Sequence, residues 1–218
     1  MRLATVVPTR DRVYSLEHVT IEKQEETRDA AKTAFAWRNE RGAKETYDEA
    51  IAGKRGAAPA PMMAWLNSPD MARHATRLGE VLRFNTMFPP KLSEIAILVT
   101  ARHWTAHYEW FAHKRLALKG GMDPKIIEAI RDRRTPEFDD PKAQMIYDVA
   151  RSLHEGHGLS QALYDEAVKL LTVRGVVEVI GLCGYYTMVS MTLNTFEFGL
   201  PAGEVIGAGV AASPRDPG

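Results

Sequence analysis

The sequence has little cysteine: Cys183 is the only one among 218 residues. An internal disulfide needs two thiols, and a cysteine-rich metal site needs several, so the sequence excludes both. Low cysteine content without disulfides is typical of proteins from a reducing compartment. The first eighteen residues, MRLATVVPTRDRVYSLEH, also lack the apolar core of a secretory signal peptide. We therefore expect a soluble, cytoplasmic protein.

Excess charge of either sign is absent as well. The chain has 28 Lys and Arg residues and 28 Asp and Glu residues, so its formal net charge is zero. No long-range field then attracts nucleic acid or an anionic membrane. We expect neither as a partner and expect a small-molecule ligand instead.

A long charge-free run lies near the C-terminal end. Residues 179–196 contain no Asp, Glu, Lys or Arg, a length that would suit a membrane span. Asn194, several Ser and Thr residues and two glycines interrupt the apolar character of this run. We predict a central helix, buried in the core or between subunits, in place of a membrane span.

No segment shows sustained alternation of polar and apolar residues or a hairpin turn signal, so we predict an all-α fold. We divide the chain into an arm with an amphipathic helix (1–44), a helical domain (45–201) and a flexible tail (202–218). The arm helix and the glycine-rich tail both suit packing against a neighbouring subunit.

Pro and Gly positions predict where helices begin and end. Ser68-Pro69, Asp123-Pro124 and Asp140-Pro141 have the pattern of a capping residue followed by proline at the first helical position. Ser93 is a candidate cap for the apolar helix that follows it. Gly120-Gly121 predicts a left-handed helix end, and a further helix is expected from Ser160 to about Leu171. Four residues are predicted to line one face of the helix after Ser68: Ala72, Ala75, Leu78 and Leu82.

The stretch from Pro89 to Gly121 holds most of the residues suited to chemistry. In a helix Glu109 and His113 are four residues apart and project about 40° from each other, so they can act as a pair. His107 and Glu109 point about 160° apart, so His107 cannot join that pair on the same face. The alternative is that the pair merely supports its own helix. Glu94 starts the preceding apolar helix, where a carboxylate could simply favour the helix dipole.

His103 and His107 are also candidate metal ligands, but the sequence disfavours a metal site. His103 and His107 are also four apart, on the other face, but a site would need a third ligand from another element. The aromatic residues nearby, including Trp104 and Trp110, could line a substrate pocket, although aromatics at helical spacing usually belong to a core.

Three stretches together resemble the carboxymuconolactone decarboxylase and alkylhydroperoxidase D superfamily, over roughly residues 45–201. They are LNSPDMARHATRLGEVLRF, LSEIAILVTARHWTAHYEWFAHKRLALKGGM and VEVIGLCGYYTMVSMTLNTFEFGLP. The middle stretch is the specific one. The resemblance implies a helical bundle that forms homo-oligomers, often trimers or hexamers, with active sites near subunit contacts.

In the peroxidase branch of that superfamily, a Glu precedes a Cys-x-x-Cys-x-x-x-His helix. By spacing, Glu94 takes the Glu position and His113 the His position, while Ala106 and Glu109 stand at the two cysteine positions. A dithiol cycle needs both a nucleophilic and a resolving thiol, and Cys183 lies in a different helix. Thiol peroxidase activity is therefore disfavoured.

The remaining Glu-Trp and His pattern resembles the decarboxylase branch, which converts a carboxylated muconolactone without metal or organic cofactor. The resemblance implies His113 as general acid/base, Glu109 as its orienting or shuttling partner, and Glu94 as the end of a short relay. Candidate substrate-binding residues are Arg102, His107 and Trp110, with Arg102 suited to a carboxylate. We expect a cofactor-independent lyase or proton-transfer enzyme. The alternative is a non-catalytic helical oligomer that serves binding or assembly.

Overall fold

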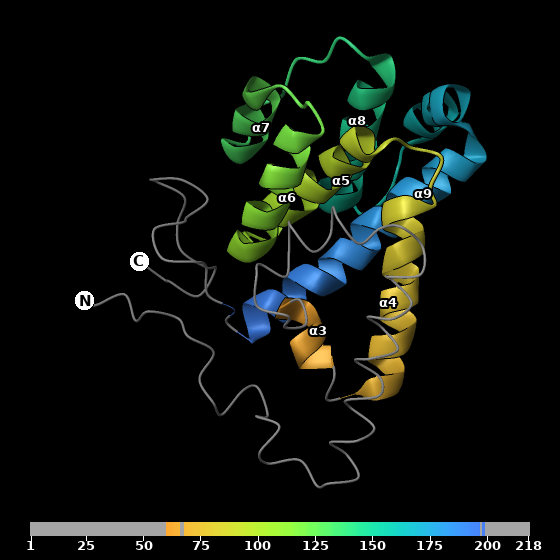
Figure 1. Cartoon of the computed structure of the whole chain (residues 1–218). Coiled ribbons are helices and arrows are strands. Elements are labelled where there is room, and N and C mark those ends of the chain that lie inside the picture. Colours follow the sequence, from red (N-terminus) through yellow and green to blue (C-terminus); the bar gives the residue numbers. More distant parts are fainter. Residues whose placement is uncertain (1–59, 66–67, 197, 199–218) are drawn as a thin grey trace, which may run out of the picture. The chain divides into compact units, whose positions relative to one another are not determined.

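A computed structural model describes residues 60–65, 68–196 and 198, and all of its regular structure in this part of the chain is helical (Figure 1). The predicted all-α class is confirmed. The predicted arm (1–44) and tail (202–218) lie outside the described residues. The helices are α3 (Ala60–Trp65), α4 (Pro69–Phe84), α5 (Pro90–His103), α6 (His107–Lys119), α7 (Pro124–Arg131), α8 (Pro141–Gly156) and α9 (Gln161–Thr195).

The described residues fall into two compact units. The first contains α3, α4 and the end of α9 from Thr192, and the second runs from Asn85 to Met191. In the first unit the Trp65 indole N–H donates to Thr192 Oγ1 over 3.0 Å. All the residues of the candidate site belong to the second unit.

In the first unit α4 begins at Pro69, directly after Ser68, as predicted. Ala72, Ala75 and Leu82 are buried, but Leu78 is 48% exposed, so its predicted place in the core is wrong. Leu78 is six residues after Ala72 and therefore projects about 120° away from it. The buried face instead includes Thr76.

Helix α5 forms the centre of the second unit, where it packs against α6, α7 and α8. Every residue from Leu92 to Ala101 is buried, because helices cover α5 on several sides. The predicted interior position of this apolar helix is confirmed. Ser93 is not its cap: α5 begins at Pro90, since proline at a first position starts the helix three residues earlier, and Ser93 is buried within it.

The predicted Asp-Pro helix starts are confirmed at both sites. Asp123 accepts a hydrogen bond from the Lys125 backbone N–H over 2.8 Å, and Asp140 accepts one from the Lys142 N–H over 2.8 Å. These side chains satisfy N–H groups that have no partner within the first turn. At the end of α6 Gly121 has a φ of 79°, the predicted left-handed conformation.

Helix α9 consists of two helical pieces joined at Thr172, whose φ of 66° and ψ of 166° are not helical. The first piece therefore ends at Leu171, as predicted. A Cβ at Gly175 would lie 3.0 to 3.2 Å from side-chain atoms of Leu171, Phe88 and Met87, so a larger residue here would require these side chains to shift.

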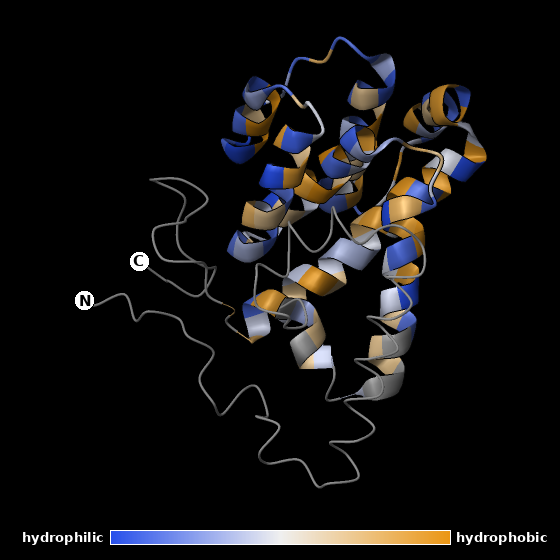
Figure 2. Cartoon of the chain, viewed as in Figure 1, coloured by the Kyte–Doolittle hydropathy of each residue, from blue (hydrophilic) through white to orange (hydrophobic). Residues whose placement is uncertain are grey.

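Polar residues interrupt the apolar ones along α9 (Figure 2). Among the described residues, no helix combines the length and apolar character that a membrane crossing requires.

Candidate active site

A sharp chain reversal between α5 and α6 creates the candidate site. Thr105 has a φ of 49°, and the Ala106 N–H donates to the Ala101 carbonyl over 2.9 Å. The chain therefore turns back, and α6 packs along α5. Because the helix is interrupted between His103 and His107, our prediction that these two residues share one continuous helical face is wrong.

A carboxylate and an imidazole meet across this hairpin. His113 Nδ1 lies 2.7 Å from Glu94 Oε2, and the side chains of the two residues are 5% and 4% exposed. An ionised carboxylate only accepts hydrogen bonds, so Nδ1 carries the hydrogen and Nε2 is the nitrogen that gains or loses a proton. Glu94 thus fixes both the tautomer and the orientation of the ring.

The alternative that Glu94 only interacts favourably with the dipole of its own helix fits this geometry less well. Glu94 is the fifth residue of α5, which begins at Pro90, and the effect of a helix dipole fades beyond the first turn. Its partner is a side chain on a different helix.

The second carboxylate, Glu109, is also anchored across helices. Ser190 Oγ on α9 donates to Glu109 Oε2 over 2.6 Å, and both residues are buried. Glu109 and His113 lie on one continuous helix, α6, as the spacing predicted. Each of them also bonds a residue on another helix, so the pair does more than support α6.

Aromatic rings from α9 close the site. The Tyr186 ring meets the His113 ring edge to face, with centroids 4.9 Å apart and planes 81° apart. Tyr185 packs against Tyr186 in a similar way at 5.3 Å. The sequence left the roles of these tyrosines open and gave no role to Ser190. The one available signal was the four-residue spacing of Tyr186 and Ser190, which places them on the same side of α9.

The predicted substrate-binding residues lie in different surroundings. Trp110 is 2% exposed and belongs to the core. Both ring nitrogens of His107 are buried with no hydrogen-bond partner among the described residues. Burial and the charge of Arg102 lower the pKa of His107, so the ring is neutral near pH 7.

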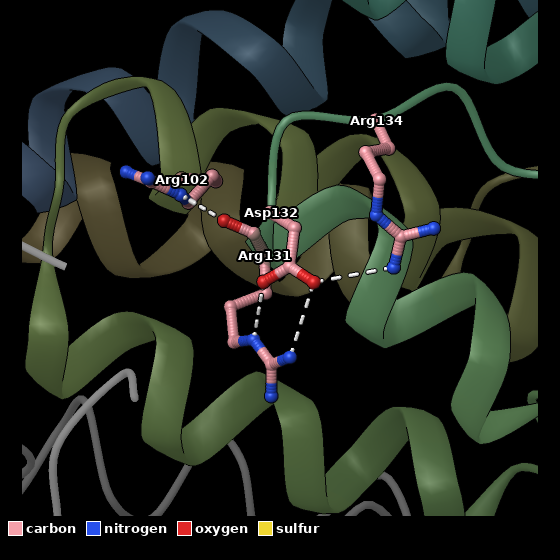
Figure 3. Close-up of polar contacts among 4 residues, drawn as sticks. All are labelled: Arg102, Arg131, Asp132 and Arg134. Atoms are coloured by element: carbon pink, nitrogen blue, oxygen red, sulfur yellow. Dashed lines mark hydrogen bonds and ion pairs between the residues drawn. The ribbon is translucent and has the colours of Figure 1, made fainter. Parts of the chain in front are cut away.

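Arg102 lies away from the carboxylate and imidazole. It is eight residues after Glu94 on α5, which places it about 12 Å further along the helix axis. Its Nε donates to the Arg131 carbonyl (Figure 3), and a second nitrogen lies 3.4 Å from Thr105 Oγ1. Within this chain Arg102 therefore serves a separate region at the far end of α5.

The described residues contain no cluster of three or more His, Cys, Asp or Glu side chains arranged to hold a metal ion. Cys183 is buried, and burial raises the pKa of its thiol to about 12. A thiol that stays protonated at neutral pH is a poor nucleophile.

No model of a known protein family matches this sequence, and no curated protein matches it either.

Proposed function

We propose that this protein is a cofactor-independent acid–base enzyme in which His113 moves a proton to or from a small lactone or carboxylated acid. The observation that supports this proposal is the buried 2.7 Å contact between His113 Nδ1 and Glu94. A helical bundle rarely buries an imidazole and two carboxylates without a use for them, because taking such groups out of water is costly. The sequence resemblance to the decarboxylase branch suggests the substrate class.

The chemistry requires one well-placed proton. When a lactone acid loses CO₂, the electrons of the broken C–C bond move toward the lactone carbonyl, and the resulting carbanion must be protonated. Nε2–H of a protonated His113 delivers that proton, and Glu94 stabilises the charged ring through Nδ1–H. The neutral ring must then take up a proton from solvent before the next turnover, and Glu109, one turn earlier on α6, is the residue to which we assign the relay of that proton.

Access to the imidazole depends on movement. Glu94, Glu109 and His113 are all less than 5% exposed. A substrate therefore reaches Nε2 only when a covering group is displaced, and the Tyr186 ring beside His113 is the candidate. We expect Tyr186→Ala to raise kcat/KM for a bulky substrate, whereas His113→Ala abolishes turnover.

The decisive experiment measures CO₂ release from 4-carboxymuconolactone by the wild type, His113→Ala and His74→Ala. His74 is exposed on α4 and serves as the matched histidine control. We expect loss of activity in His113→Ala only. Turnover that survives His113→Ala would remove His113 from the mechanism. If the wild type does not act on this lactone, deuterium exchange into other small lactones and carboxylic acids tests whether the protein transfers protons to a different substrate.

A second function, assembly into a homo-oligomer, is favoured by an exposed apolar stripe on α9. Val173, Val177, Ile180 and Met191 are 46 to 60% exposed. Their spacings of four, three and eleven residues follow a seven-residue repeat, the pattern with which helices pack side by side. A second copy of this chain carries the same stripe and is the occupant we propose. The number of copies, a trimer or hexamer, stays a prediction from the sequence resemblance.

Light scattering on the full chain tests this assembly. Val177→Glu should dissociate the oligomer, whereas Lys169→Glu, a charge reversal at an exposed position of α9 off the stripe, should not. A monomeric wild type, or an oligomer unaffected by Val177→Glu, would contradict the proposed surface. An intact oligomer with no proton-transfer activity would favour the purely structural role.

A further inference from the structure

A second polar cluster surrounds a pocket at the far end of α5. The pocket has a volume of about 80 Å³ and opens between α5, α8 and the residues after α7. Its polar lining consists of Arg102, His103, Arg133, Arg151, His154 and Glu155, together with Tyr147. Neither the proposed catalysis nor the α9 stripe uses this pocket.

Two of the arginines that line it have no carboxylate partner among the described residues. Asp132 pairs with Arg131 at 2.7 Å and with Arg134 at 3.2 Å, as Figure 3 shows. Glu155 pairs with Arg151 at 3.0 Å. Both carboxylates are thus engaged with other arginines; Asp132 offsets part of the charge of Arg102 from a distance, but neither carboxylate pairs directly with Arg102 or Arg133.

Those two charges are close enough to affect each other. The pKa of Arg102 is lowered by burial and by the charge of Arg133. Arg102 is held at the pocket by its bond to the Arg131 carbonyl. Arg133 has a φ of 56° because it is the left-handed residue that ends α7, where the Arg133 N–H donates to the Ile130 carbonyl and the Arg134 N–H to the Ala129 carbonyl. Two like charges beside one pocket are an arrangement suited to binding an anion.

Two stacked imidazoles form another wall of the pocket. The rings of His103 and His154 lie 4.7 Å apart with planes 20° apart. The Thr100 hydroxyl donates its hydrogen to the Ala96 carbonyl, so it accepts a hydrogen bond from His154 Nε2–H over 2.8 Å. Neutral His154 therefore carries its lone pair on Nδ1.

Burial is the main reason why both histidines of the pocket are neutral. The pKa of His103 is lowered by burial and by Arg133, with smaller opposing and supporting effects of Glu155 and His157. The pKa of His154 is lowered to about 4 by burial and by His103. Both rings are neutral near pH 7, so the arginines supply the charge.

We infer that this pocket binds a small oxyanion, a carboxylate or phosphate group, between Arg102 and Arg133. Arginine presents paired N–H donors that match either group. Because a water molecule takes up about 30 Å³ in the liquid, the volume suits a group of a few non-hydrogen atoms, with the rest of a larger ligand outside. The inference is independent of the chemistry proposed at His113.

Calorimetric titrations with inorganic phosphate and with acetate test the inference, and comparing the two distinguishes a phosphate ligand from a carboxylate ligand. Chloride keeps the ionic strength constant in both titrations. We expect saturable binding of at least one of them, with a Kd near or below about 1 mM. Arg133→Gln should weaken it about tenfold or more, because a charged donor pair is lost. Arg134→Gln, which removes an exposed arginine that does not line the pocket, should leave the affinity unchanged.

An NMR titration of His103 gives a readout that does not depend on catalysis. A bound anion should raise the pKa of His103 in the wild type and in Arg134→Gln but not in Arg133→Gln. Absence of saturable binding of either anion, or equal binding by Arg133→Gln and Arg134→Gln, would overturn the inference. Arg133 is exposed, so its substitution tests binding without disturbing the core.

Discussion

The charged residues at the two ends of α5 have opposite environments. Near its start, Glu94 is buried and directly paired with His113. At its end, Arg102 borders an open pocket and has a backbone carbonyl as its bonded partner. A buried charge needs a partner because it has lost its water, whereas a charge at the surface is screened by solvent. The first arrangement makes stability and the proposed acid–base chemistry depend on the same groups, while the second leaves charge available for the proposed anion.

Glu94→Ala should have the largest effect on stability. Removing one member of a buried pair leaves the other without its partner, which costs about 3–5 kcal/mol. Urea unfolding followed by circular dichroism measures this loss. Glu155→Ala, which breaks the exposed pair with Arg151, should cost about 1 kcal/mol or less. Equal losses of unfolding free energy in Glu94→Ala and Glu155→Ala would contradict the difference between the buried pair and the exposed pair.

Ser190→Ala should have an intermediate effect. It removes the hydroxyl that donates to the buried Glu109 and leaves that carboxylate with one hydrogen bond fewer, at a cost of about 1.5–3 kcal/mol. Ser152→Ala is the matched control, because Ser152 donates to the neutral Gly158 carbonyl at a partly buried position. If Ser152→Ala proved as costly as Ser190→Ala, the burial and charge of Glu109 would not be what makes its bond important.

Acidification should have the smallest effect, at the pocket end. Because the pKa of His154 in the folded chain is about 4, below its ordinary value of 6.5, the unfolded state takes up the proton first as the pH falls. Stability should therefore be complete above pH 6.5 and decline between about pH 6.5 and 4, by roughly 1–2 kcal/mol after allowance for partial exposure. The lowered pKa values of His103 and His107 act in the same direction.

Urea unfolding of the wild type and His154→Gln at pH 7 and pH 4.5 checks this decline. The variant cannot protonate at this position, so it should lose less stability than the wild type between the two pH values. His74→Ala, at an exposed position on α4, should behave like the wild type. The same pH dependence in His154→Gln as in the wild type would rule out His154 as its source.

Much of the fold followed from local signals. Asp123 and Asp140 start helices because their side chains reach backbone N–H groups two residues later. The shared side of α6 for Glu109 and His113 followed from helix geometry alone. Leu78 was placed wrongly because it projects about 120° away from Ala72 on α4, and Ser93 because Pro90 already starts α5 three residues earlier.

The contacts between elements could not be predicted in this way. Ser190 and Glu109 are 81 residues apart, and Thr100 and His154 are 54 apart. No periodicity links such positions, since they meet only after several helices have packed. The resemblance put Glu94 at the end of a relay and gave the orienting role to Glu109, whereas the structure has Glu94 bonded directly to His113; the chain reversal at Thr105 explains how this contact forms.

The chain reversal at Thr105 also restricts the length of the turn between α5 and α6. Nineteen residues of uninterrupted helix would hold Glu94 and His113 about 28 Å apart, yet their side chains meet at 2.7 Å. Adding or deleting one residue in the three-residue turn would change how α6 packs along α5 and carry the imidazole away from the carboxylate. The length of this short turn is therefore as much a part of the candidate site as the residues that it brings together.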